Sequence, residues 1–211
     1  MTTGIERPLQ IESGDMVFKP WIHHEAIQRR VAQMAGYLAT RFNGQDVRFL
    51  PILKGALPFS RLMVAGMSRL PYGPSSITID TIQVKSYQGT RSRELSWLQV
   101  PQSPAHPKVH DVLLEDIADS ARTLTAVETH MRQQGGASLT TAVLLDRPAA
   151  RAPDVDYKPD LVGFGISNPE AWAIGFGLDL GEQYRDLPDI YGRVGPDGKL
   201  PPYIIPPLPD V

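Results

Sequence analysis

The chain has 211 residues, of which 42% are hydrophobic and 21% charged, the composition of an ordinary globular domain. It contains no cysteine, so disulfides, thiolate catalysis and cysteine metal sites are excluded. The net charge of −2, with scattered basic residues, excludes the concentrated positive face of a nucleic-acid binder, and no apolar run approaches the roughly 18–20 residues that cross a bilayer.

The N-terminal segment, residues 1–15, lacks the apolar core of a signal peptide, so we expect a cytoplasmic protein. From the charge and the short apolar runs we expect no nucleic-acid partner and no membrane partner.

From His24 to Phe42 apolar residues recur at helical spacing, which predicts a helix. The run Val47–Leu53 has the pattern of a buried strand. A second helix is predicted from Pro58 to about Leu70, with the proline in its first turn.

The β-branched segment Ile77–Val84 predicts another strand, and the polar segment Lys85–Pro107 predicts a long loop. Beyond the loop we expect three buried strands, at Val112–Leu114, Thr141–Leu145 and Leu161–Ile166. A helix is expected between the first two of them, at Thr123–Gln134. Strands that alternate with helices imply right-handed crossovers. The sequence therefore predicts an α/β fold with a mainly parallel twisted sheet flanked by helices.

The most informative stretch follows the strand at Val112–Leu114, where two adjacent carboxylates, Glu115 and Asp116, precede a turn of small and hydroxyl residues. In an open α/β sheet, ligands bind at the carboxyl ends of the strands, and amides at a following helix N-terminus form a nest for phosphate. Carboxylates there would repel phosphate unless they bind ribose hydroxyls or a hydrated Mg²⁺. The alternative is that Asp119 and Ser120 only cap the next helix.

The segment from Val112 to Leu124 resembles the phosphoribosyl pyrophosphate signature of the type I phosphoribosyltransferases: an apolar strand, two acids, two apolar positions, then Asp-Thr-Gly-x-Thr. Within that group, residues 14–194 resemble the hypoxanthine-guanine phosphoribosyltransferases. The resemblance implies a small hood subdomain, formed from the N-terminal segment and the residues after about 147. The proline-rich residues 195–211 are then a C-terminal tail, which we expect to be an extended arm or an interaction strap.

Three further segments support the resemblance, in the family's order. Leu53-Lys54-Gly55 is similar to the pyrophosphate loop, where the family carries a non-proline cis peptide, here between Leu53 and Lys54. Lys85-Ser86-Tyr87 is similar to the start of the flexible catalytic lid, which we expect to extend to about Pro104. The third segment runs from Trp172 to Asp179, with Arg185 beyond it.

The resemblance implies a reaction in which a purine base and phosphoribosyl pyrophosphate give a nucleoside monophosphate and pyrophosphate, with Mg²⁺ as cofactor. It makes Asp119 the catalytic group, which would exchange a proton with purine N7. Ribose and 5′-phosphate contacts would come from Glu115, Asp116, Ser120, Ala121, Arg122 and Thr123. Pyrophosphate contacts would come from Lys54, Gly55 and Arg185, base contacts from Arg147, Trp172 and Ala173, lid contacts from Ser86 and Tyr87, and metal ligands from Asp179, Glu115 and Asp116.

Two positions depart from the family's pattern. Ala121 stands where the phosphate loop normally has glycine, and a side chain there would cost something like 1 kcal/mol if the backbone needs a positive φ. Arg147 stands where the family has the lysine that reads the purine 6-oxo group. A guanidinium is larger and planar but also donates to a carbonyl oxygen, so a 6-oxopurine is the expected base. The alternative is that Arg147 points to solvent and recognition is done otherwise.

We therefore expect a purine salvage enzyme that uses hypoxanthine or guanine, and the family's habit implies a homodimer or homotetramer. One alternative is a phosphoribosyltransferase for another base, such as xanthine or a non-purine heterocycle. Another is a non-catalytic regulator that senses a nucleotide and binds RNA or protein. The regulator predicts a basic face and decayed catalytic positions, yet Lys54, Asp119, Asp179 and Arg185 all remain.

Overall fold

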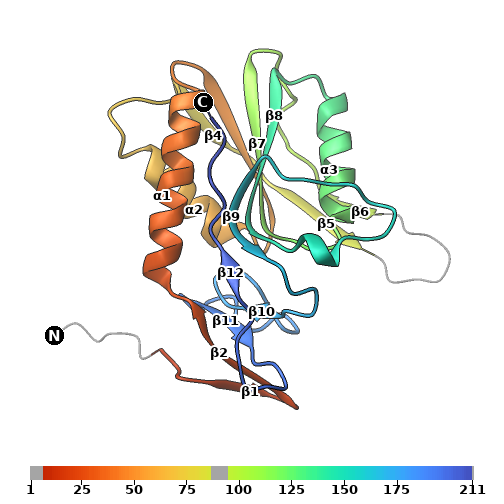
Figure 1. Ribbon diagram of the computed structural model, residues 1–211. Helices are drawn as coiled ribbons and strands as arrows, with labels where there is room; N and C mark the ends of the chain where they lie inside the picture. Colours follow the sequence, from red (N-terminus) through yellow and green to blue (C-terminus); the bar gives the residue numbers. More distant parts are fainter. Residues whose placement is uncertain (1–6, 87–94, 211) are drawn as a thin grey trace.

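The computed structural model describes residues 7–86 and 95–210, in which helices pack against the larger of two sheets (Figure 1). The helices are α1 (His24–Arg41), α2 (Leu57–Met67) and α3 (Arg122–Gln133), with a short 3₁₀ turn, η1 (Pro148–Ala150). No helix in these two ranges has both the length and the apolar character needed to cross a bilayer.

The larger sheet has the strand order β12-β9-β8-β7-β3-β5-β6, and β4 also pairs with β3. Strands β3, β7, β8 and β9 are parallel neighbours, whereas β6 and β12 join the two edges in antiparallel orientation. The strands are β3 (Asp46–Leu53), β4 (Ser76–Ile79), β5 (Ile82–Ser86), β6 (Leu95–Gln99), β7 (Val109–Ala118), β8 (Ser138–Asp146), β9 (Leu161–Ile166) and β12 (Tyr203–Ile204).

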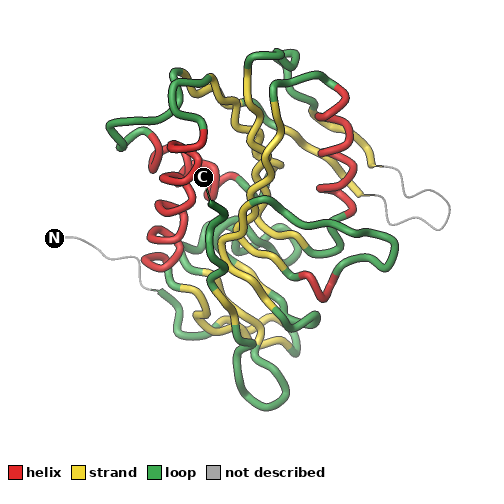
Figure 2. The backbone as a smooth tube through the Cα atoms, turned by 45° about the horizontal axis from the view of Figure 1, so that its top comes forward, coloured by secondary structure: helices red, strands yellow, loops and turns green. Residues whose placement is uncertain are grey.

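Helices cover both faces of this sheet because successive side chains of its central strands point to opposite sides. In β7, Val112 and Leu114 belong to the core that includes α1 and α2, while Leu113 packs in the core that includes α3. Figure 2 shows the strands lying between α1 and α2 on one side and α3 on the other. A strand segment that is buried on both faces is apolar at successive positions, which is why the centre of β7, Val112–Leu114, is a continuous apolar run in the sequence.

A second, smaller sheet is antiparallel throughout and lies beyond one end of the larger one (Figure 1). Its order is β1-β2-β11-β10, with bounds β1 (Ile11–Ser13), β2 (Met16–Ile22), β10 (Ala173–Ile174) and β11 (Ile190–Arg193). Phe18, Ile174 and Tyr191 form its own buried cluster. This sheet therefore joins the N-terminal segment to the segment that carries Trp172 and Arg185.

The expected elements from α1 to β9 are largely confirmed. The structure has a helix or strand at each of these predicted positions, with ends that differ by a few residues: His24–Phe42, Val47–Leu53, Pro58–Leu70, Val112–Leu114, Thr123–Gln134, Thr141–Leu145 and Leu161–Ile166. The predicted strand Ile77–Val84 is two strands, β4 and β5, which pair in turn with the same strand β3.

The prediction of a loop throughout Lys85–Pro107 is wrong. Ser86 is the last residue of β5, and β6 forms an antiparallel pair with β5. Trp97 of β6 packs against the core below α3, and its ring lies 4.5 Å from that of His130. This strand is held by its partner strand and by one large aromatic residue, so its sequence carries no clear period of its own.

The proline-rich tail is extended, as expected, and it docks on its own chain. Strand β12 pairs with β9 at the edge of the larger sheet. The indole N–H of Trp21 donates to the carbonyl of Pro201 at 2.8 Å, and the buried guanidinium of Arg30 donates to the carbonyl of Pro206 at 2.6 Å. The tail thus completes one edge of the sheet and lies against α1.

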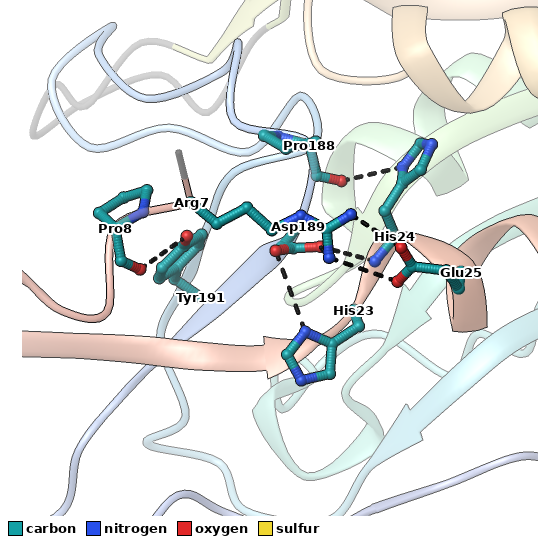
Figure 3. A network of polar contacts seen from close by, with 8 residues as sticks. All are labelled: Arg7, Pro8, His23, His24, Glu25, Pro188, Asp189 and Tyr191. Atoms are coloured by element: carbon teal, nitrogen blue, oxygen red, sulfur yellow. Dashed lines mark hydrogen bonds and ion pairs between the residues drawn. The ribbon is translucent and has the colours of Figure 1, made fainter. Parts of the chain in front are cut away.

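A polar network ties the small sheet to the start of α1 (Figure 3). The buried carboxylate of Asp189 accepts the backbone N–H of His24 at 2.6 Å, as negative charge at a helix N-terminus should. Arg7 lies 3.5 Å from the same carboxylate and also pairs with Glu25 at 2.8 Å. The ring of His24 contacts the carbonyl of Pro188 at 3.1 Å. The network therefore fixes the C-terminal end of the segment that carries Arg185.

Candidate active site

Three loops meet at the carboxyl ends of β3 and β7. A methyl group on Gly55 would lie 1.8 Å from Oδ2 of Asp116, and one on Gly177 would lie 2.0 Å from the carbonyl oxygen of Gly55. The loop after β3, the end of β7 and the turn after β10 are therefore in direct contact. The predicted cis peptide between Leu53 and Lys54 is present in the first of these loops.

The turn between β7 and α3 forms a small pocket at the helix N-terminus. Thr125 donates the first intrahelical bond, to the carbonyl of Ala121 at 2.9 Å, so the amides from Arg122 to Leu124 have no carbonyl within the helix to bond. Such amides attract anions. The pocket has a volume of about 180 Å³ and is lined by Glu115, Asp116, Ile117, Asp119, Ser120, Ala121, Thr123 and Leu124.

The alternative that Asp119 and Ser120 only cap the helix is wrong. The N-cap residue of α3 is Ala121, which can make no side-chain cap, and the carboxylate of Asp119 pairs instead with Arg147. Ser120 is exposed at the pocket. The guanidinium of Arg122 pairs with Asp154, at 2.9 Å for one of its two contacts, and Arg122 does not line the pocket.

The backbone at Ala121 has the left-handed conformation that the glycine of the family pattern would favour. Its φ is 57° and its ψ is 9°, and the residue is buried. For a residue with a Cβ this conformation costs roughly 1–2 kcal/mol. The turn predicted to bind phosphate therefore has the conformation that a glycine would favour, and it carries some strain.

We expect Ala121→Gly to change the free energy of unfolding by less than ~0.5 kcal/mol, because relief of the strain offsets the lost methyl burial and the greater freedom of the unfolded chain. The control is Ala126→Gly in the exposed middle of α3, which should destabilise by ~1 kcal/mol. Urea unfolding of both variants measures the difference. Equal losses would mean that Ala121 is unstrained.

Glu115 and Asp116 place two carboxylates side by side at the end of β7. Burial raises the pKa of both groups, and the neighbouring Asp116 carboxylate raises the pKa of Glu115 further. The carboxylate of Asp116 accepts the backbone N–H of Ile117 at 2.8 Å, and the carboxylate of Glu115 accepts the backbone N–H of Asp116 at 3.1 Å. The protein alone therefore compensates the negative charge of this pair poorly. Hydroxyl donors or a cation would stabilise the charged form of the two carboxylates.

The two carboxylates fit Mg²⁺ only as part of a set completed by substrate. Within residues 7–86 and 95–210, no three His, Asp or Glu side chains are close enough together to hold a metal ion. Mg²⁺ is commonly bound by one or two carboxylates, with substrate phosphates and waters as the other ligands. The third predicted ligand, Asp179, pairs with Arg185 at 2.8 Å rather than joining Glu115 and Asp116.

The cations predicted to contact pyrophosphate both meet the turn after β10. Lys54 Nζ lies 2.6 Å from Glu182, a residue that the sequence did not single out. Arg185 contacts Glu182 at 3.0 Å and donates to the carbonyl of Gly177 at 2.7 Å. The positive charge of Arg185 also acts to lower the pKa of Asp116. The structure therefore brings Lys54, Arg185 and Asp116 into one site.

Asp119 and Arg147 form an ion pair across the ends of β7 and β8. Arg147 Nη2 lies 2.6 Å from Asp119 Oδ2, and the arginine side chain is only 13% exposed. The alternative in which Arg147 points to solvent is therefore wrong. One further atom of each partner, Asp119 Oδ1 and Arg147 Nε, is buried and has no hydrogen-bond partner among the described residues. A buried acceptor and a buried donor are thus left unpaired by the protein itself.

Arg151, just after η1, holds the backbone beneath this pair and was missed from the sequence. Its guanidinium donates to the carbonyls of Ala118 and Asp119, the latter at 2.7 Å, and pairs with the carboxylate of Asp146. Its Nε donates to the carbonyl of Tyr157 at 3.2 Å. The sequence gives no sign of this role, because every partner except Asp146 is a backbone atom.

The other two residues predicted to hold the base, Trp172 and Ala173, lie at the start of β10. Trp172 is 45% exposed, so much of its indole is available for stacking, and its carbonyl accepts the N–H of Arg193 at 2.8 Å. Ala173 is the first residue of β10. Of the predicted lid residues, Ser86 ends β5, whereas Tyr87 lies outside the described residues. The lid therefore stays a prediction.

Comparison with known proteins identifies the family to which the chain belongs. Residues 22–180 match the family model of the phosphoribosyl transferase domain. The hypoxanthine-guanine phosphoribosyltransferase of Bacillus subtilis (strain 168) is 30% identical over 173 residues, which are 82% of this chain and 91% of the relative. That of Streptococcus pneumoniae (strain ATCC BAA-255 / R6) is 29% identical over 82% of this chain and 91% of its own.

Solved structures give the same result. A crystal structure of a hypoxanthine-guanine phosphoribosyltransferase from Bacillus anthracis has a TM-score of 0.73 at 29% identity, covering 87% of this chain and all of the other. The hypoxanthine phosphoribosyltransferase of Trypanosoma cruzi in complex with the product IMP has a TM-score of 0.75 at 26% identity. The match covers 90% of this chain and 99% of the other. The chain belongs to the phosphoribosyltransferase family and, within it, to the hypoxanthine-guanine phosphoribosyltransferases.

Proposed function

We propose that this enzyme transfers ribose 5-phosphate from phosphoribosyl pyrophosphate to hypoxanthine or guanine, giving IMP or GMP and pyrophosphate. The observation that carries the choice of base is the unpaired donor and acceptor on the Arg147–Asp119 pair. A 6-oxopurine presents an acceptor, O6, and a donor, N7–H, along one edge. Arg147 Nε–H and Asp119 Oδ1 offer the complementary donor and acceptor. Relatives named for hypoxanthine and guanine support the same choice.

In the proposed reaction the bond from ribose C1′ to pyrophosphate breaks and a bond from C1′ to purine N9 forms. Asp119 takes the N7 proton as the base attacks, and returns it in the reverse direction. Lys54 and Arg185 hold the leaving pyrophosphate by fixed positive charge. Glu115 and Asp116 bind the ribose hydroxyls, and the amides of the turn from Ser120 to Thr123 bind the 5′-phosphate. Mg²⁺ bound with the substrate supplies further positive charge against the leaving group.

We also propose that residues 14–194 form the catalytic domain, with the small sheet as its hood and Trp172 stacked on the base. The exposure of the Trp172 side chain supports the stacking role. A homodimer or homotetramer in the cytoplasm completes the proposal. Large apolar side chains such as Ile79 and Leu98 are exposed and available for contact with a second copy of the chain.

The test is a panel of bases with phosphoribosyl pyrophosphate and Mg²⁺, in which pyrophosphate release gives kcat/KM for hypoxanthine, guanine, xanthine and adenine. We expect Arg147→Ala to lower the value for hypoxanthine by roughly 10–100-fold and to narrow its gap to adenine, because the buried donor that faces O6 is lost. Arg147→Lys should keep the preference for oxopurines. No release with any base would refute the proposed function, whereas four values unchanged by Arg147→Ala would refute only the role of Arg147.

A further inference from the structure

The carboxylate of Glu182 bridges the two cations assigned to pyrophosphate. Its Oε2 lies 2.6 Å from Lys54 Nζ, and its Oε1 lies 3.0 Å from Arg185 Nη2. Each oxygen of one anionic group is thus bound to one cation. This is the pattern in which two oxygens of a pyrophosphate group would meet the same two side chains.

The backbone holds Glu182 in this position at a conformational cost. Leu180 and Gln183 pair across a tight turn whose two central residues, Gly181 and Glu182, have φ of 61° and 67°. Glycine is the favoured residue at the second of these positions, so a glutamate there is strained. The amide of Glu182 also donates to Asp179 at 2.8 Å. A turn that keeps a strained glutamate between two cations suggests a role for its side chain.

The contacts of Glu182 with Lys54 and Arg185 can be replaced by contacts with a solute anion. The side chains of Lys54 and Glu182 are 59% and 63% exposed, so water and solute anions reach both of them. The carboxylate of Glu182 accepts one hydrogen bond from each cation, and both bonds lie at the surface. A group with higher negative charge binds the same cations more strongly and displaces an exposed carboxylate.

We propose that Glu182 is an internal competitor for the pyrophosphate subsite: it holds Lys54 and Arg185 in place when the subsite is empty and weakens the binding of pyrophosphate. This inference rests on the proposed function for its ligand. It makes Glu182 a positioning residue, which sets how tightly the product is held before release. Product release limits turnover in many enzymes, so a competitor of this kind speeds the cycle.

The test is the dissociation constant of inorganic pyrophosphate, measured by titration calorimetry with and without Mg²⁺ for the parent and Glu182→Gln. We expect the variant to bind pyrophosphate ~3–10-fold more tightly in both conditions, since two exposed charge contacts no longer compete. Glu182→Gly should do the same and also relieve the turn. The matched control is Glu12→Gln on β1, which removes the same charge from an exposed side chain that bonds Gln10 and neither cation, and should leave the constant unchanged.

Binding by Glu182→Gln that matches the Glu12→Gln control would overturn the inference, as would weaker binding in either condition. Weaker binding only with Mg²⁺ would identify Glu182 as part of the metal site instead of a competitor. The base panel on the parent enzyme keeps the two claims separate. Tighter pyrophosphate binding in an enzyme that uses no purine would support the competitor and refute the proposed function.

Discussion

Asp119→Asn is expected to lower kcat by ~10²–10⁴-fold in both directions of the reaction, the usual range for a positioned acid–base group. The carboxylate oxygen that Arg147 leaves free, Oδ1, is buried and is the atom proposed to take the N7 proton. An amide has the same shape but accepts no proton at neutral pH. Steady-state rates of IMP formation and of its pyrophosphorolysis measure the loss.

The control separates proton transfer from the ion pair. Arg147→Met removes the partner of Asp119 and keeps the carboxylate, so it should affect base binding more than kcat. Asp119→Asn should also cost ~1–3 kcal/mol of stability, because the Arg147 side chain, which is only 13% exposed, is left without its charged partner. If Asp119→Asn kept the parent kcat, or lowered kcat no more than Arg147→Met does, the N7 proton would have another acceptor.

Gly55→Ala is expected to lower kcat/KM by ~10²-fold while costing only ~1–3 kcal/mol of stability. The added methyl group would lie 1.8 Å from Asp116 Oδ2, which is the end of a side chain and can move. Movement of this carboxylate relieves the clash but takes the carboxylate away from the proposed ribose site. Pyrophosphate release at low substrate concentration gives kcat/KM, and urea unfolding gives the stability.

Two controls make the prediction specific. Gly36→Ala, in α1, meets nothing within 4 Å and should be neutral or slightly stabilising. In a double-mutant cycle, Gly55→Ala should have little further effect on an Asp116→Ala background, because both changes act on one carboxylate. Additive losses in the cycle would mean that Gly55 acts through its own loop and not through Asp116.

The sequence alone determined the central elements and the phosphate turn. The central runs Val112–Leu114 of β7 and Ala142–Leu145 of β8 are apolar at every position because both faces of the strands are buried there. Helices α1 and α3 carry a helical period because one face of each is buried. The signature after β7 placed two acids, a turn and a helix N-terminus in consecutive positions. The cis peptide before Lys54 was implied by the resemblance to the family's pyrophosphate loop, and the glycine of the family's pattern pointed to the positive φ at Ala121.

Only the tertiary structure decided which of these residues act on one another. The small sheet joins β2 to β11, and its short strands are held by partners distant in the sequence, so no local pattern predicted it. The pairing of Asp119 with Arg147 likewise depends on β7 and β8 lying side by side. Glu182 reaches Lys54 because the turn after β10 packs on the loop after β3. Charge contacts between such loops depend on distance in space, which residue spacing along the chain does not encode.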